Sequence, residues 1–118
     1  MRITDYEFAP SALRELSRIF RVSETRFGLD ARKRYEALFS QAIRDLLENP
    51  TRIGTQPDDG RIHYHLKHSR TRVTGEKVRD PRHLLVVRID GALMMVLAIV
   101  HDAMVEGAAR RIQEGEES

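Results

Sequence analysis

The sequence of 118 residues contains no cysteine. This absence excludes a disulfide scaffold, thiol catalysis and a cysteine-based zinc site, and it fits a reducing, cytoplasmic setting. Long hydrophobic runs are also absent, because the longest, residues 92–100, is far shorter than the roughly 20 residues of a membrane helix. The N-terminal segment, MRITDYEFAP, lacks the apolar stretch of a signal peptide. We therefore expect a soluble protein with no membrane contact.

The length of the chain fits a single domain that buries a core without a metal or a disulfide. We expect one domain over residues 1–118, with its core from about residue 3 to residue 105. Residues 106–118 should form a short helix or fray.

The net charge of +2 hides an uneven distribution. Residues 61–88 hold eight Lys and Arg side chains against two acidic ones, together with four of the five histidines. This segregation favours one basic face directed at an acidic partner, such as nucleic acid or a negatively charged protein surface. A solvated strand rim of the same composition is the alternative explanation.

The first half of the chain predicts one strand and two helices. Residues 2–8 alternate as a strand does, and Pro10 marks the start of an amphipathic helix that should fade between residues 21 and 24. Asp30 is a candidate N-cap for a second helix with a broad apolar stripe, which should end at residues 49–50, Asn-Pro. So short a link between the helices predicts an antiparallel helical hairpin.

The second half predicts strands. We expect a loop at 51–60, a strand at 61–68, a short strand or mobile loop at 70–81, and two strong strands at 82–89 and 93–100. Asp90-Gly91 between the last two strands predicts a tight turn with positive φ at both central residues. The almost continuous apolar character of these strands predicts burial on both faces.

These elements predict an α+β domain in the order β-α-α-β-β-β(-β), with the helical hairpin packed on one face of a twisted antiparallel sheet.

Several polar residues could carry chemistry. His63 and His65 are two apart on a strand and could begin a metal site, but nothing specifies further ligands, so we expect neither a metal nor a cofactor. Histidine and arginine side chains can also catalyse RNA cleavage without a metal. One group removes the 2′-hydroxyl proton, another protonates the leaving oxygen, and cations hold the phosphate. The side chains available for it are Arg61, Arg82, His83, Arg88 and His101. Each could equally close a structural hydrogen bond at a strand end.

Four stretches together resemble the ParE branch of the ParE/RelE toxin superfamily over residues 3–105. They are FG at 27–28, the tyrosine-centred helix ARKRYEALFSQAIRDLLENP, PRHLLVVRI, and IVHDAM. The resemblance implies the fold derived above and a growth-inhibiting toxin of a type II toxin–antitoxin system, of the kind associated with plasmid stabilization. It also implies a ParD-like antitoxin as partner. ParE-like toxins are associated with poisoning DNA gyrase, whereas RelE-like relatives cleave mRNA on the ribosome.

The residues favour the first of these activities. RelE-like enzymes typically carry a tyrosine near the C-terminal end of the sheet, and this chain has no tyrosine beyond Tyr64. We therefore expect a toxin that binds gyrase without covalent chemistry. Its target-binding surface would consist of Arg61, Arg82, His83, Arg88, His101 and Asp102.

We expect the antitoxin to bind an apolar helical groove that contains Leu13, Leu16, Phe20 and Tyr35. If the chain is instead a ribosome-dependent mRNA endonuclease, its catalytic residues would be His83, His101 and Arg82. A family member that survives only as a binding module is a third possibility.

Overall fold

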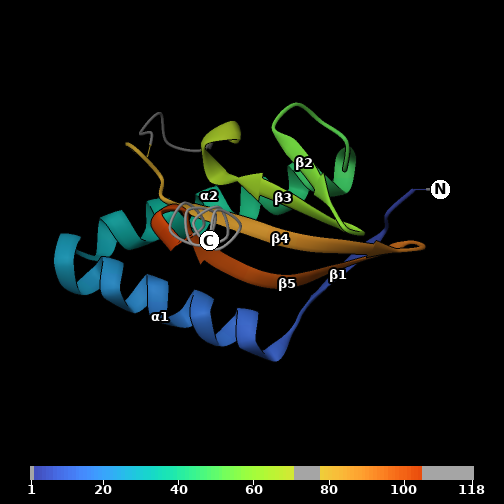
Figure 1. Ribbon diagram of the computed structural model, residues 1–118. Helices are drawn as coiled ribbons and strands as arrows, with labels where there is room; N and C mark the ends of the chain where they lie inside the picture. Colours follow the sequence, from blue (N-terminus) through green and yellow to red (C-terminus); the bar gives the residue numbers. More distant parts are fainter. Residues whose placement is uncertain (1, 71–77, 105–118) are drawn as a thin grey trace, which may run out of the picture.

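The computed structural model describes residues 2–70 and 78–104 (Figure 1). Its elements, in chain order, are β1 (Asp5–Phe8), α1 (Pro10–Phe27), α2 (Leu29–Glu48), β2 (Thr55–Asp58), β3 (Arg61–His65), the 3-10 turn η1 (Leu66–His68), β4 (His83–Asp90) and β5 (Leu93–His101). The expectations for the tail at 106–118 and for most of the segment at 70–81 lie outside the described residues.

The sheet has five strands in the order β1-β5-β4-β3-β2. β3, β4 and β5 pair antiparallel, as expected, and β2 adds antiparallel to β3. β1, however, runs parallel to β5, from Asp5 opposite Leu93 to Phe8 opposite Val96. The prediction of a purely antiparallel sheet is therefore wrong, and the sheet is mixed. A parallel pair needs a crossover instead of a hairpin, and the chain between β1 and β5 supplies it.

Both helices are present, with boundaries that differ from the expectation. The first continues to Phe27, because the chain meets no helix breaker before Gly28, whose φ is +93°. The second begins at Leu29, so Asp30 lies in its first turn and is not the N-cap. Its carboxylate still favours the positive end of the helix. The helix ends at Glu48, with Asn49 as its C-cap, as the Asn-Pro pair predicts.

α1 and α2 lie on one side of the sheet, and the core fills the space between the layers (Figure 1). From the helices, the buried apolar residues are Ala12, Ile19, Leu38, Phe39, Ala42, Ile43 and Leu46. From the sheet, they include Tyr64, Leu85, Val87, Met94, Val96 and Ile99. Removing so much apolar surface from water is the main force that holds the hairpin on the sheet.

A β-bulge in β5 decides which residues face the helices. The register shifts between Val86 and Val87, so Val87 lies opposite Val96 and Leu85 lies opposite Ile99. Leu97 is the extra residue of the bulge. Ile99 therefore faces the helices, and His101, two residues further, lies on the same side.

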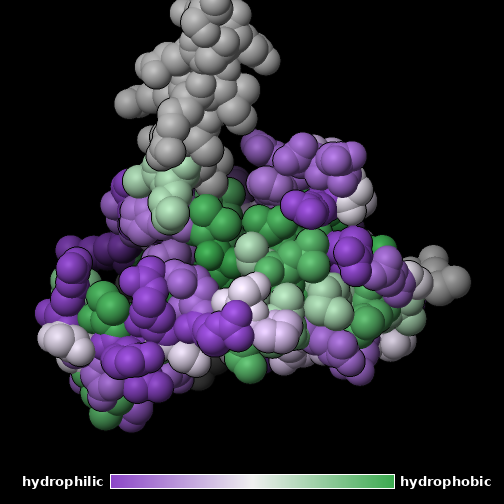
Figure 2. Space-filling model, turned by 60° about the horizontal axis from the view of Figure 1, so that its bottom comes forward, coloured by the Kyte–Doolittle hydropathy of each residue, from purple (hydrophilic) through white to green (hydrophobic). Residues whose placement is uncertain are grey.

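The opposite face of the sheet is only half covered. Leu84, Met95 and Val100 are of intermediate exposure, so the prediction of burial on both faces is only partly right. On the face seen in Figure 2, hydrophobic residues gather in the middle and hydrophilic residues surround them.

The turns give one missed strand and one confirmed hairpin. Residues 55–58 form β2, which we expected to be loop, and Asp59 and Gly60, both with positive φ, turn the chain into β3. The hairpin predicted at Asp90-Gly91 lies between β4 and β5, as expected. The predicted positive φ at both central residues is wrong, because Asp90 pairs with Leu93 as the last residue of β4, and in this turn only Gly91 has a positive φ.

A buried polar chain ties α2 to β3. The hydroxyl of Tyr64, which is fully buried, lies 2.7 Å from Ser69 Oγ, and Ser69 Oγ donates to Asp45 Oδ2 at 2.7 Å. Arg52 Nη1 lies 2.6 Å from the same carboxylate oxygen. Burial acts to raise the pKa of Asp45, but these partners outweigh it and the pKa lies below its ordinary value.

Within the described residues, no helix has both the length and the hydropathy that are needed to cross a membrane.

Candidate functional site

The strand ladder brings four of the predicted site residues together. His83 begins β4 and lies opposite His101 at the end of β5, with ring centroids 5.2 Å apart and nearly perpendicular planes. The backbone N–H of Asp102 donates to the carbonyl oxygen of Arg82 at 2.8 Å. Two hydrogen-bonded central strands therefore hold these side chains at one end of the sheet.

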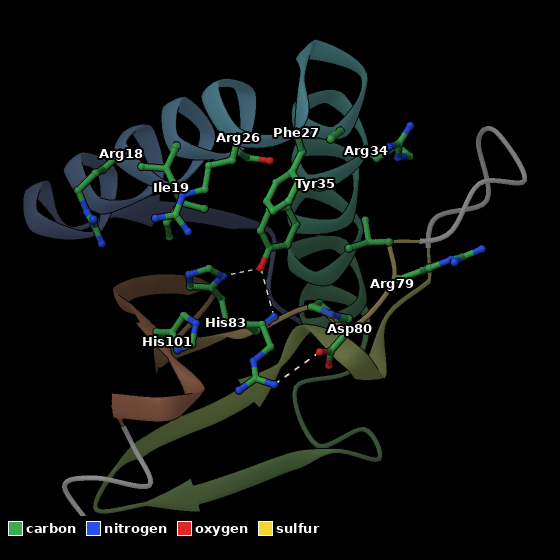
Figure 3. A pocket seen from close by; sticks show the side chains of 16 residues that line it. Arg18, Ile19, Arg26, Phe27, Arg34, Tyr35, Arg79, Asp80, His83 and His101 are labelled. Atoms are coloured by element: carbon green, nitrogen blue, oxygen red, sulfur yellow. Dashed lines mark hydrogen bonds and ion pairs between the residues drawn. The ribbon is translucent and has the colours of Figure 1, made fainter.

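Tyr35 of α2 joins this group. Its hydroxyl accepts a hydrogen bond from the backbone N–H of Arg82 at 3.4 Å and contacts Nδ1 of His83 (Figure 3). We assign the hydroxyl proton to the contact with Nδ1, because among the described residues no other acceptor lies within hydrogen-bond reach of the Tyr35 hydroxyl. With this assignment, His83 carries its own proton on Nε2.

The surroundings keep this pair neutral. Burial, and after it the neighbouring His101, lower the pKa of His83 to about 4. Burial raises the pKa of Tyr35 to about 12. At neutral pH, His83 is uncharged and Tyr35 is a phenol.

His101 is more exposed, but its Nδ1 is also occupied. The backbone N–H of Ala103 donates to His101 Nδ1 at 3.1 Å. In the neutral form its proton is therefore on Nε2, as in His83. The two rings thus offer N–H donors, and neither keeps its Nδ1 lone pair free.

Asp102 organises the other side of the strand end. His65 Nε2 lies 3.2 Å from Asp102 Oδ2, while Arg82 Nη2 lies 3.1 Å from Oδ1. The N–H of Lys67 donates to His65 Nδ1 at 3.0 Å, so His65 donates to Asp102 from Nε2. Burial acts to raise the pKa of Asp102, but His65, Arg82 and His101 together hold it below its ordinary value.

A pocket of about 1260 Å³ opens beside the histidines, between α1, α2 and the start of β4 (Figure 3). Its lining is strongly basic, with five arginines against one aspartate. These charged residues are Arg18, Arg26, Arg34, Arg79, Arg82 and Asp80. Tyr35, His83 and His101 lie in the same lining, so the histidine pair faces a cationic hollow.

Arg61 and Arg88 lie elsewhere. Ile62 lies opposite Val87, so Arg61 comes next to Arg88 toward the far end of β4. That position is about 17 Å from His83, at about 3.4 Å per residue. Arg88 is also engaged by Asp90 at 3.0 Å. The six residues predicted as one surface therefore divide into a group of four and a separate pair.

The two strand histidines have different partners. His63 Nε2 lies 3.3 Å from Asp58 Oδ2, whereas His65 is bound to Asp102. Each imidazole is thus held by its own carboxylate.

The residues predicted for the antitoxin groove differ in exposure. The side chain of Leu13 is 52% exposed, while Leu16, Phe20 and Tyr35 are partly buried against the core. Sequence reasoning missed the apolar side chains around the tip of the helical hairpin. These are Val22, Phe27 and Leu29, and all three are exposed. The FG pair at 27–28 is a signal for the tip, since glycine after an apolar helical pattern commonly marks the end of a helix.

Sequence reasoning also sought a tyrosine near the C-terminal end of the sheet and found none. The structure places Tyr35 there from α2. Its position on the apolar stripe of α2 gives no sign of this contact, because the sequence does not show which strand end the helix crosses.

Comparison with known proteins identifies the family. Residues 6–106 match the family model of the ParE toxin of the type II toxin–antitoxin system parDE. Among solved structures, the chain resembles the chromosomal ParDE toxin–antitoxin system from P. aeruginosa, with a TM-score of 0.58 and 11% identity over 84% of this chain and 95% of that one. At that identity the likeness concerns the fold. No curated protein gives a significant sequence match. The family match covers most of the chain, and the chain belongs to the ParE toxin family of type II toxin–antitoxin systems.

Proposed function

We propose that the chain inhibits DNA gyrase by binding it, and that a ParD-like antitoxin neutralises it. Membership of the ParE family supports the toxin role and an antitoxin partner. The gyrase target and the ParD-like character of the antitoxin are our proposals. A gyrase target would also mean that the protein acts in the cytoplasm.

One observation carries the choice of binding over catalysis. RNA cleavage without a metal needs a group that removes the 2′-hydroxyl proton. Nδ1 of His83 is directed at the Tyr35 hydroxyl, and Nδ1 of His101 accepts from Ala103. Both rings are therefore presented as N–H donors, which suits the recognition of an acceptor or an anion better than proton removal.

The target surface that we propose is the group Arg82, His83, His101 and Asp102, with Arg61 and Arg88 as a second contact point further along the sheet. The strand ladder fixes the first group before binding, which lowers the entropic cost of forming a complex. For the antitoxin we propose the helical side of the molecule, with Leu13, Leu16, Phe20 and Tyr35 as contacts.

A supercoiling assay with purified gyrase tests the proposal. Added chain should inhibit supercoiling or trap gyrase with cleaved DNA. His101→Leu should weaken inhibition about two- to tenfold, the effect of losing one hydrogen bond. Lys33→Gln, an exposed change on α2 outside the pocket lining, serves as the matched control. Fully active gyrase in the presence of excess chain would refute the gyrase target.

The second candidate is a ribosome-dependent mRNA endonuclease. The observation that favours it is Tyr35, which stands beside His83 where sequence reasoning found no tyrosine. With His83, His101 and Arg82 as catalytic residues, His83→Ala or His101→Ala would abolish toxicity and leave antitoxin binding intact. Mapping the 5′ ends of translated transcripts after induction would then reveal cuts near the ribosomal A site, and intact transcripts would exclude this candidate.

A further inference from the structure

The pocket beside the histidines contains arginines that have no carboxylate partner among the described residues. Arg18 is paired with Glu15 at 2.6 Å, and Arg82 faces Asp102 at 3.1 Å and Asp80 at 3.5 Å. In the part of the chain that the structure describes, no carboxylate pairs with Arg26 or Arg79. A concave surface with surplus arginine attracts anions, and guanidinium groups match phosphate oxygens in geometry.

The same pocket has an apolar wall on α1. Ile19, Val22 and Phe27 line it, and Phe27 is 74% exposed at the last position of the helix. An aromatic ring so exposed beside Arg26 can take a flat apolar group against its face. In the view of Figure 3, the labelled α1 residues Arg18, Ile19 and Arg26 lie on one side of Tyr35, and Arg34 and Arg79 lie on the other.

The floor of the pocket adds imidazole N–H donors. His83 and His101 line it, and their occupied Nδ1 atoms leave Nε2–H as the donor of each ring. A group with several acceptor oxygens would satisfy these donors and the arginines together.

Size and chemistry identify the class of ligand. The pocket, at about 1260 Å³, exceeds the roughly 300–1,000 Å³ of a site for a drug-sized molecule, so it has room for more than a free phosphate or a mononucleotide. A single nucleic-acid strand combines repeated phosphates with flat bases, whereas a duplex keeps its bases stacked inside. Cationic grooves with aromatic platforms are the usual means of holding such strands.

We propose that this pocket binds a single nucleic-acid strand, with Arg26 and Arg79 on its phosphodiester groups and a base stacked on Phe27. The proposal goes beyond gyrase inhibition, because it assigns a ligand to the chain in the absence of gyrase. A toxin with such a pocket would contact the DNA of the complex that it inhibits as well as the protein.

Fluorescence anisotropy of a short labelled oligothymidylate, titrated with the purified full chain between about 50 and about 200 mM salt, tests the proposal. The parent chain should bind with an affinity that falls steeply with salt. Arg26→Gln together with Arg79→Gln removes two phosphate contacts, so the log–log salt slope should become shallower by about 1.4. Phe27→Ala should weaken binding roughly 5- to 150-fold through the loss of one stacked base.

The matched control is Arg14→Gln together with Arg21→Gln. It removes the same charge from exposed positions of α1 outside the pocket lining, and it should leave both the affinity and the slope nearly unchanged. An oligouridylate arm separates RNA from DNA as the natural source, and binding of either strand with these variant effects supports the pocket.

Three results would overturn the proposal. The first is no binding of the oligonucleotide at high protein concentration. The second is an equal loss of affinity in the pocket variants and the control variant. The third is that a duplex binds as tightly as a single strand and that Phe27→Ala changes neither affinity. Because this assay contains no gyrase, a negative result here would not affect the supercoiling test of gyrase inhibition.

Discussion

Replacing His83 with asparagine removes one titrating group from the interior and leaves its neighbours in place. Asparagine Oδ1 occupies nearly the position of Nδ1, so it can still accept from the Tyr35 hydroxyl. The side chain no longer takes up a proton in acid. The variant therefore isolates the contribution of His83 to the pH dependence of stability.

The sign follows from the direction of the pKa shift. Burial lowers the pKa of folded His83 from 6.5 to about 4. Above pH 6.5 the ring is neutral in both states and contributes nothing to the pH dependence. Between about pH 6.5 and about pH 4 the unfolded chain binds a proton that the folded chain does not, so the wild-type protein loses stability as the pH falls.

The magnitude follows from the same two values. A shift from 6.5 to about 4 corresponds to a loss of about 3 kcal/mol once the pH lies below both values. At pH 4.5 most of that loss, about 2.5 kcal/mol, has accrued. Because His83 is only partly buried, solvent screening reduces the expected effect to about 1–2 kcal/mol.

Urea unfolding of both proteins at about pH 7.5 and about pH 4.5 measures this effect. We expect the stability gap between the wild-type protein and His83→Asn to shift by about 1–2 kcal/mol in favour of the variant at the lower pH. His68, whose pKa burial also lowers, is present in both proteins and cancels in the difference. Parallel pH profiles for the two proteins would refute a buried, neutral His83.

Three further changes test other contacts, each by urea unfolding at neutral pH. Tyr35→Phe should cost about 1–3 kcal/mol, because it leaves His83 Nδ1 and a backbone N–H without their partner; an unchanged stability would argue against that contact. Ser69→Ala should cost a similar amount, about 1–3 kcal/mol, by breaking the buried polar chain between α2 and β3, and a neutral result would mean that water replaces the hydroxyl. Gly54→Ala should cost about 2 kcal/mol or more, because φ is +100° and the new Cβ would lie 2.5 Å from His68 Cδ2; a wild-type midpoint would show that this turn relaxes.

Apolar periodicity was sufficient to predict the helical hairpin and the two central strands. The Asn-Pro stop after α2 and the second Asp-Gly turn are local signals, so their positions could be predicted from neighbouring residues alone. β2 could not be recognised in the same way. Its four residues, TQPD, have no apolar alternation and form a strand because β3 offers them a partner.

The parallel pairing of β1 with β5 depends on contacts between the two ends of the chain. Local pattern carries no information on strand direction, and for this reason the prediction defaulted to antiparallel pairing. The bulge at Leu97 could not be predicted from local pattern either, because it is a property of the register between two strands.

The sequence predicted only the part of the candidate site that lies at the ends of the strands. Arg82, His83, His101 and Asp102 meet because they lie at, or next to, the ends of two paired strands. Tyr35 was assigned to a different role, since contacts from a helix to a strand end depend on how the two layers cross. The arginines of α1 and α2 were missed for the same reason, because their convergence on one pocket is a property of packing.

The central proposal, that this member of the ParE toxin family inhibits gyrase by binding and not by catalysis, is tested most directly by the stoichiometry of inhibition. Supercoiling by a fixed amount of gyrase should be measured against increasing molar ratios of the chain. We predict that inhibition rises with the ratio and saturates near equimolar chain, as complex formation requires. Two results would contradict it. Either gyrase stays fully active at a large molar excess of chain, or its supercoiling activity is lost at trace amounts of chain, which would indicate catalysis.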